Sequence, residues 1–280
     1  MEKINKQKYL AVTKYCDYDN HNIIDFVKSY KKVNQNDKDL AIALFEYVRD
    51  NIKYRVGAWS KRASETMESQ TGMCTTSTNL LVALFRAAGI PSGYCIYKVI
   101  GGESFGHILP SFIKESISSS SVHIVCFVYI DNRWIKCDPS TDTELSLKTK
   151  HIDNLTDLII WDGEHDAVHP INEKHIISMS EPLDNIDYQL EKKPRYITKH
   201  FIFPIGNIYI DFLRKRGHQI RSREDIDKEF IKWFKQNHLS LYVKYNLFRT
   251  PWKWYKKVKN NYIVKNESIS DRRSSLGSHR

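Results

Sequence analysis

The sequence has no pair of cysteines in a CxxC arrangement, and its cysteines are five, an odd number. A small secreted domain stapled by disulfides and a zinc knuckle both need paired cysteines, so this pattern argues against both classes. We therefore expect reduced thiols in a cytoplasmic protein. The cysteines are Cys16, Cys74, Cys95, Cys126 and Cys137.

Long uncharged apolar runs are also missing. The longest candidate, residues 201–210, includes Pro204 and Gly206, whereas a membrane span needs about 18 or more such residues. The first ten residues carry positive charge with no apolar stretch behind them, so no secretory signal is expected. The 280 residues include only 11 Gly and 8 Pro, and 41% are hydrophobic. Collagen-like and wholly disordered chains are thus excluded, and a substantial buried core is expected.

Apolar residues at steps of three and four predict helices over residues 22–32, 37–52, 75–88 and 224–237, with Asp37 capping the second. The strongly apolar third helix ends before Gly89 and Pro91, and it is expected at the centre of the domain. The region between the second and third helices reads as an irregular polar loop. Strands are predicted over residues 93–99, 122–130 and 133–138, and a tight turn joins the last two.

Cys74 stands immediately before the apolar helix, in the sequence Gly72-Met73-Cys74-Thr75. A thiol at a helix N-terminus lies near unpaired N–H groups and the positive end of the helix dipole, and both favour the thiolate. Cys74 is therefore the candidate nucleophile. The alternative is a small buried core residue, which is the interpretation for Cys95, Cys126 and Cys137.

The predicted hairpin brings a histidine and an aspartate together. If residues 131–132 form the turn, counting outward places Val125 opposite Asp138. Because side chains alternate along a strand, His123 then lies on the same face as Asp138, roughly 7 Å or less away between Cβ atoms. A carboxylate that accepts from one ring nitrogen leaves the other nitrogen as a base for a thiol. The alternative is that His123 and Asp138 are a polar pair at a strand end with no catalytic role.

Five sequence blocks resemble, in their order, the transglutaminase-like superfamily of papain-fold cysteine enzymes. They lie within residues 37–140 and read VRDNIKY (48–54), ASETM (63–67), GMC with NLLVALFRAAGIP (72–74 and 79–91), HIVCFVY (123–129) and RWIKCDPS (133–140). The sequence departs from the family in having Ile124-Val125 where Ala-Trp is frequent, and in a Ser-rich segment before the hairpin.

The resemblance implies an α+β fold of the papain-like kind, with the catalytic cysteine at the N-terminus of a central helix packed on an antiparallel sheet. It also implies a catalytic triad: Cys74 as nucleophile, His123 as general base and acid, and Asp138 as the residue that orients His123. No cofactor is implied. Some relatives depend on calcium, but no acidic cluster here argues for it.

These residues predict acyl transfer through a thioester. The Cys74 thiolate would attack an amide or thioester carbonyl, His123 would protonate the leaving group, and the acyl group would pass to water or to an amine. The expected activity is that of a peptidase or amidase, or of an amide-forming acyltransferase, and the donor could be bound to a carrier protein. The alternative from another class is a non-catalytic binding module of the same fold.

The oxyanion of this reaction needs hydrogen-bond donors. The backbone N–H of Cys74 is one expected donor. Trp59 is the first candidate for the second, because related enzymes use an upstream Trp, Gln or Tyr, and Tyr54 and Gln70 are alternatives. Trp59 could equally be a wall of the substrate groove.

Other histidines are weaker candidates. His107 is a rival base, but it has no carboxylate partner on a shared strand face. His165 and His169 stand four residues apart in an acidic stretch, which resembles part of a metal site but is more typical of an exposed loop. No HExxH motif, phosphate-binding Gly loop or EF-hand loop occurs, so no metal or cofactor is expected.

Positive charge is unevenly distributed. The formal net charge is +10, but residues 191–280 hold 22 Lys and Arg against 8 Asp and Glu, a net charge of +14, and the first 190 residues carry −4. This predicts a catalytic domain over residues 1–190, a basic, aromatic-rich and partly helical extension over 191–265, and a disordered tail over 266–280. The extension could pack on the core, dock an acidic partner or carrier protein, or contact a membrane surface or nucleic acid.

Overall fold

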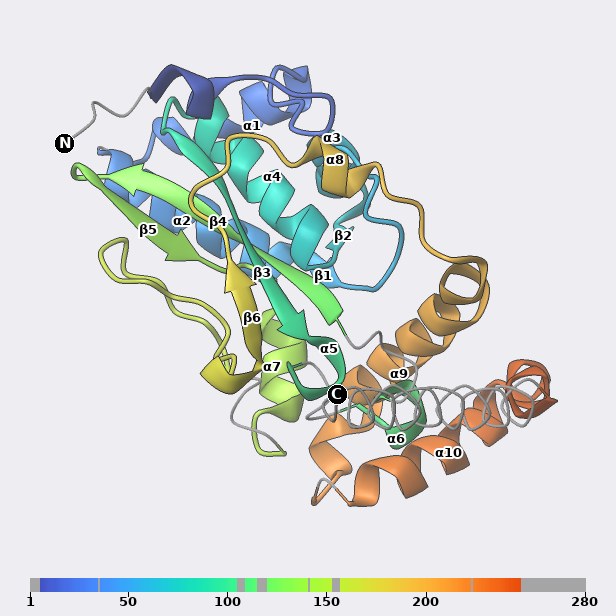
Figure 1. Ribbon diagram of the computed structural model, residues 1–280. Helices are drawn as coiled ribbons and strands as arrows, with labels where there is room; N and C mark the ends of the chain where they lie inside the picture. The colour runs from blue at the N-terminus through green and yellow to red at the C-terminus, as the bar shows by residue number, and fades with distance from the viewer. Residues whose placement is uncertain are drawn as a thin grey trace, which may run out of the picture. The chain divides into compact units, whose positions relative to one another are not determined.

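The structure is a computed structural model that describes residues 6–34, 36–104, 109–114, 120–140, 142–152, 157–222 and 224–247. The chain forms two compact units, one up to Phe230 and one from Ile231. The first unit holds a mixed arrangement of helices and a curled sheet (Figure 1). This is the α+β architecture that the sequence predicts.

A four-stranded antiparallel sheet, ordered β5-β4-β3-β6, is the framework of the first unit. Its strands are β3 (Ser92–Ile100), β4 (Ser120–Ile130), β5 (Arg133–Cys137) and β6 (Ile176–Met179).

The hairpin register is the predicted one, since Ile130 is the partner of Arg133 and Val128 is the partner of Ile135. Both turn residues, at positions 131 and 132, have positive φ angles of 50° and 62°. That conformation suits a tight turn between twisted strands. The prediction of this register is confirmed.

Helices cover one face of the sheet (Figure 1). They are α1 (His21–Lys31), α2 (Asp37–Asn51), α3 (Ala63–Ser69) and α4 (Cys74–Ala87). Helix α4 contacts β3 and β4, and its residues 80–85 are fully buried. The predicted central helix is therefore confirmed, beginning one residue earlier than expected.

Two local predictions were wrong. Residue Asn36, not Asp37, caps α2, because its side chain accepts from the Asp39 backbone N–H at 2.8 Å. The region before Cys74 is also not an irregular loop throughout, since it contains α3. The Arg62 backbone N–H donates to the Glu65 carboxylate at 2.8 Å, which satisfies one of the groups left open at the helix start. Two turns are too few to produce a visible apolar period.

The other face of the sheet carries a smaller apolar cluster, which includes Cys95 of β3 and Val125 and Phe127 of β4. All five cysteines are unpaired and buried. Burial raises the pKa of Cys95 to about 11, which makes this thiol a poor nucleophile at neutral pH. The interpretation of Cys95, Cys126 and Cys137 as core residues agrees with their complete burial.

The central helix offers a matched test of the core. Leu81 of α4 is fully buried, whereas Leu147, in helix α7 (Thr143–Thr149), is 56% exposed. We expect Leu81→Ala to lower the free energy of unfolding by about 2–5 kcal/mol and Leu147→Ala by about 0.5 kcal/mol or less, measured by urea denaturation. Equal losses in the two variants would contradict this placement of α4.

The chain beyond residue 190 continues within the first unit as far as Phe230. Helix α8 (Asp187–Leu190) directly precedes this part, which holds η4 (Thr198–Ile202), α9 (Phe203–Arg216) and α10 (Asp225–Asn237), and α10 runs on into the second unit. Helix α9 buries Tyr209, Phe212 and Leu213 and contacts α7. The domain boundary at residue 190 stays a prediction, and the tail over residues 266–280 lies outside the described residues.

In the second unit, residues 239–247 are helical. The Phe234 ring lies 5.6 Å from the Tyr242 ring. Among the described residues of both units, no helix is long and apolar enough to cross a membrane.

Candidate active site

Cys74 is the first residue of α4, and a short parallel ladder leads into it. Strand β1 (Lys53–Tyr54) pairs with β2 (Thr71–Gly72), which directly precedes the helix. A Cβ atom at Gly72 would crowd the Ser77 hydroxyl and the Ile52 side chain, so the tight passage from β2 into α4 favours glycine. The Met73 backbone N–H donates to the Thr76 hydroxyl at 2.9 Å, which closes the first turn. The chain thus fixes Cys74 at the helix N-terminus, where it is 8% exposed.

His123 and Asp138 form a buried pair, as the hairpin register requires. The imidazole Nε2 lies 2.6 Å from the carboxylate Oδ2. Asp138 is fully buried, and its other oxygen accepts from the Ser140 backbone N–H at 3.0 Å. One helical turn beyond Cys74, the Thr78 hydroxyl donates to the Ile124 carbonyl at 2.9 Å. This bond holds the start of α4 against the strand segment that carries His123.

The pair is electrostatically coupled to Cys74. Burial alone would favour a neutral imidazole, but the charge of Asp138 and its hydrogen bond, together with a hydrogen bond to Cys74, raise the pKa of His123 well above its ordinary value. Burial likewise disfavours the ionised Asp138, yet the charge of His123 outweighs it and lowers the pKa of the carboxyl group. The structure therefore brings the three predicted residues together.

The phenol of Tyr54 lies within electrostatic reach of Cys74. Burial raises the pKa of its phenol, and the charges of Cys74 and Asp138 raise it further. A phenol that resists ionisation remains a hydrogen-bond donor at neutral pH. The sequence offers Tyr54 only as an alternative to Trp59 for the second oxyanion donor. Nothing in the residues around Tyr54 sets it apart from the other tyrosines of the chain.

The remaining candidates lie in different surroundings. The Trp59 ring packs 6.2 Å from the Phe203 ring, and its buried indole N–H has no hydrogen-bond partner among the described residues. Gln70 is exposed, and its backbone carbonyl accepts a hydrogen bond from the Lys53 backbone N–H at 2.9 Å. His107 lies outside the described residues.

The predicted absence of a metal site is not tested by a structure without ligands. His165 is exposed and bonds Asp162 at 2.7 Å. The charge of His169 contributes to the lowered pKa of Asp138, which places this second histidine within electrostatic reach of the buried pair. Within the described part of the chain, no three His, Cys, Asp or Glu side chains gather as a metal would require.

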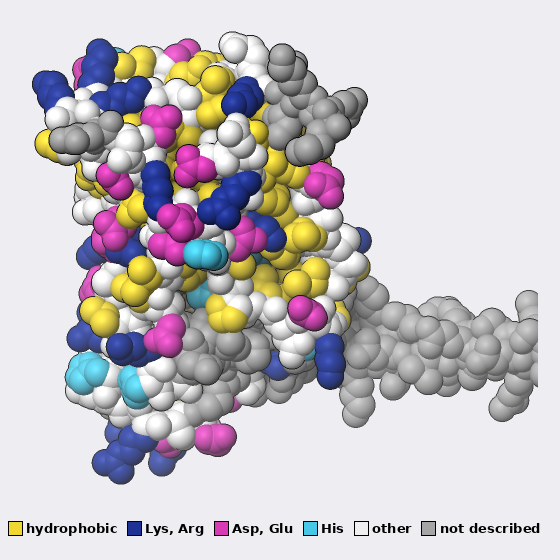
Figure 2. Space-filling model, turned by 90° about the vertical axis from the view of Figure 1, so that its left-hand side faces the viewer, with side chains coloured by type: hydrophobic (Ala, Val, Ile, Leu, Met, Phe, Trp, Pro, Cys, Tyr) yellow, Lys and Arg dark blue, Asp and Glu magenta, His cyan; other side chains and the backbone are white. Residues whose placement is uncertain are grey.

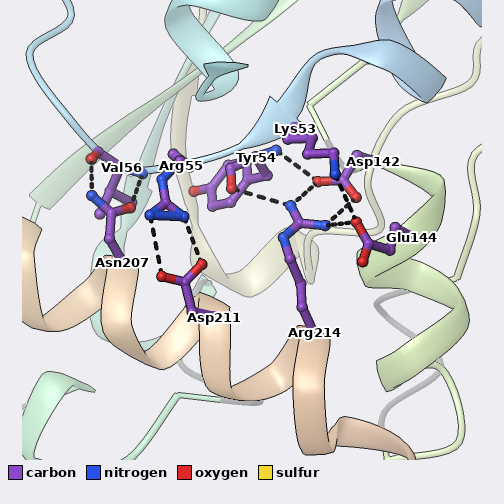
Figure 3. A network of polar contacts seen from close by, with 9 residues as sticks. All are labelled: Lys53, Tyr54, Arg55, Val56, Asp142, Glu144, Asn207, Asp211 and Arg214. Atoms are coloured by element: carbon purple, nitrogen blue, oxygen red, sulfur yellow. Dashed lines mark hydrogen bonds and ion pairs between the residues drawn. The ribbon is translucent and has the colours of Figure 1, made fainter. Parts of the chain in front are cut away.

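A second ion pair beside the site has no signal in the local sequence. Asp142 is 1% exposed, and the guanidinium of Arg214 from α9 binds its carboxylate, with Nη1 at 2.9 Å from Oδ1 (Figure 3). The Asp142 side chain also accepts from the Tyr54 N–H at 2.6 Å. Asp142 is recognisable as a cap of α7, since it accepts from the Leu145 N–H at 2.9 Å. Its partner stands 72 residues further along, and only the tertiary structure joins them.

A cysteine at the start of a central helix, packed against an antiparallel sheet that carries a buried His-Asp pair, defines the papain-like class of cysteine-dependent enzymes. Residues 24–139 match the model of the transglutaminase-like superfamily. This segment, which contains all three site residues, is therefore similar to that superfamily.

One solved structure found in the comparison is named "Putative Cysteine Protease" and comes from Cytophaga hutchinsonii. The identity is 19% and the TM-score is 0.38, and the match covers 49% of this chain and 43% of that one. The present chain therefore spans less than half the length of that protein. None of the curated proteins compared matches this sequence.

Proposed function

We propose that this protein is an acyl-transfer enzyme that forms a thioester on Cys74 and passes the acyl group to water or to an amine. The observation that carries the proposal is the buried His123–Asp138 pair coupled to a cysteine at a helix N-terminus. In this arrangement Asp138 orients His123, and the protonated imidazole stabilises the thiolate and donates a proton to the leaving group. The binding-module alternative gives no reason to bury such a pair beside a thiol.

The oxyanion of the tetrahedral intermediate needs two donors. The backbone N–H of Cys74 lies in the first turn of α4, where no helical carbonyl can accept it. We assign the second donor to the Tyr54 hydroxyl, because it lies within electrostatic reach of Cys74 and stays protonated. The unpartnered indole N–H of Trp59 is the alternative donor, or a wall of the substrate groove.

The assignment of Tyr54 predicts a specific loss of rate. Tyr54→Phe removes only the hydroxyl, so we expect acylation of Cys74 to slow by about 100-fold or more, with little change in the free energy of unfolding. Acylation is measured as the release of p-nitrophenolate from p-nitrophenyl acetate. Trp59→Phe is the matched variant, and a larger loss there would transfer the oxyanion role to Trp59.

Substrate delivery is the proposed task of the basic part. Lys192, Lys193, Arg195 and Lys199 are all exposed along one short segment, and such a cluster attracts an acidic donor, including an acidic carrier protein. On the face drawn in Figure 2, by contrast, Lys and Arg side chains lie beside Asp and Glu side chains.

The five unpaired cysteines support the expectation of a reducing, cytoplasmic location.

The reaction type is tested by product analysis. The protein is incubated with an acyl donor, either a peptide amide or a thioester, with and without a primary amine. We expect the free acid in water and a new amide when the amine competes, both depending on Cys74. The proposal fails if neither product exceeds the amount formed by the Cys74→Ala variant.

A further inference from the structure

Strand β1 lies next to the active site, and in the described part of the chain one of its two edges is not paired with another strand. Its ladder to β2 uses the Lys53 N–H, which donates to the Gln70 carbonyl at 2.9 Å, and the Arg55 N–H, which donates to the Gly72 carbonyl at 2.8 Å. Backbone groups of successive residues in a strand point to opposite sides. The backbone groups of Tyr54 and Val56 therefore point away from β2, and within the described residues the β1–β2 sheet has two strands.

Side chains of α9 complete this edge in place of a third strand (Figure 3). The Asn207 amide accepts from the Val56 N–H at 3.0 Å and donates to the Val56 carbonyl at 2.9 Å, as the backbone of a neighbouring strand would. Arg214 donates to the Tyr54 carbonyl at 3.3 Å, and Asp142, held by Arg214, accepts from the Tyr54 N–H. Both polar groups of each residue are thus satisfied.

Two ion pairs support these bonds. Arg55 and Asp211 form a bidentate ion pair, in which Nη1 lies 2.6 Å from Oδ1 and Nη2 lies 3.2 Å from Oδ2. Arg214 contacts both oxygens of Asp142 and, at 3.0 Å, the Glu144 carboxylate. The Arg214 side chain is 11% exposed and that of Asp142 is 1% exposed, so little water competes for this pair. A planar guanidinium meets this geometry, whereas the single ammonium group of a lysine does not.

We propose that α9 is a positioning element of the active site, in which Arg214 and Asn207 fix the backbone of Tyr54 in β1 and of Val56 just beyond it, and thereby hold the Tyr54 hydroxyl near Cys74. The inference rests on the proposed function, since it assigns α9 a role in the same acyl transfer. It also gives part of the basic segment a use that does not involve a partner. A displacement of about 1 Å of an oxyanion donor can lower a rate by about 100-fold, so loss of the clamp is expected to act on acylation.

The first test measures the clamp without activity. Hydrogen–deuterium exchange of the backbone amides is followed in the full chain and in Asn207→Ala. We expect the Val56 amide to exchange at least about tenfold faster in the variant, while the Arg55 amide, which is bonded to β2, changes less than about twofold. Asn237→Ala is the control, because that amide donates to the Trp233 carbonyl in α10.

The second test separates positioning from general damage. p-Nitrophenyl acetate acylates the thiol through an oxyanion, releasing p-nitrophenolate, whereas iodoacetamide alkylates it by direct displacement of iodide. We expect Arg214→Ala to slow the acylation burst about 100-fold and alkylation less than about threefold. Arg214→Lys is expected to restore only part of the burst. Arg216→Ala, an exposed residue of α9 that donates to Gln219, is expected to behave like the wild type.

Two results overturn the inference. One is a burst that falls no more than alkylation in Arg214→Ala, because a general loss of structure would explain it. The other is an unchanged Val56 amide in Asn207→Ala. If the wild-type protein itself gives no burst above Cys74→Ala, the proposed function fails, and amide exchange still decides whether α9 holds β1.

Discussion

We expect replacement of Cys74 by alanine to lower the rate of acyl transfer by about 10⁴-fold or more, because no other group in the site can form the thioester. We also expect this variant to lose labelling by iodoacetamide at near-neutral pH. The buried core thiols stay unlabelled, since burial raises the pKa of Cys95 to about 11 and likewise that of Cys16 to about 11. Labelling is measured by peptide mapping of the alkylated protein.

Cys95→Ala is the matched control for this prediction. It removes a fully buried thiol from the smaller apolar cluster on the other face of the sheet. We expect its labelling and its acylation rate to equal those of the wild-type protein. If the two variants lose labelling to the same extent, Cys74 is not the reactive thiol.

We expect replacement of His123 by alanine to move the alkylation of Cys74 to higher pH and to lower the rate of acylation by about 10²–10⁴-fold. The protonated imidazole is the positive charge that favours the thiolate, and its pKa is raised, so the wild-type protein keeps this charge through neutral pH. The variant has no such charge near the thiol. The measurement is the second-order rate constant for iodoacetamide from pH 5 to pH 10.

We also expect the His123→Ala variant to have a lower free energy of unfolding, by an amount that depends on pH. The pKa of Asp138 is lowered, so its contribution to stability is present above the ordinary carboxyl value of about 3.9 and is lost as the pH falls through the lowered value. The pKa of His123 is raised, so its contribution is fully present below about 6.5 and is lost as the pH rises through the raised value. The pair therefore stabilises the fold most between about pH 4 and pH 6.5.

In His123→Ala the Asp138 carboxylate is left buried without its partner. We expect the free energy of unfolding to fall by about 3–5 kcal/mol at pH 6, and the loss to shrink below about pH 4, where the unpaired, buried carboxyl group of the variant is protonated. His165→Ala is the control, because the His165–Asp162 pair is exposed. An unchanged alkylation profile in His123→Ala would contradict coupling of the imidazole to Cys74.

The arrangement of the candidate site could be predicted from the sequence because its geometry is local. The turn at residues 131–132 sets the hairpin register, and the register alone places His123 diagonal to Asp138. The N-terminal position of Cys74 follows from the apolar helix behind it. Each inference depends on a period or a count over fewer than twenty residues.

The contacts around the site could not be predicted in this way. The helix α3 is too short for a period, and the bonds from Asn207 and Arg214 to β1 join residues more than 150 positions apart. The charge asymmetry suggested a separate basic extension, yet part of its charge lies in the Arg214–Asp142 pair. Net charge reports on surfaces and association and does not reveal which arginine is buried.

Intact-protein mass spectrometry during turnover tests the central claim most directly. Wild-type protein is mixed with p-nitrophenyl acetate or a thioester donor, sampled over time and mapped by peptide. We predict one acyl adduct, located on Cys74, that decays in water and decays faster when a primary amine is added. An adduct on another residue, or none on Cys74 while product accumulates, would contradict the account.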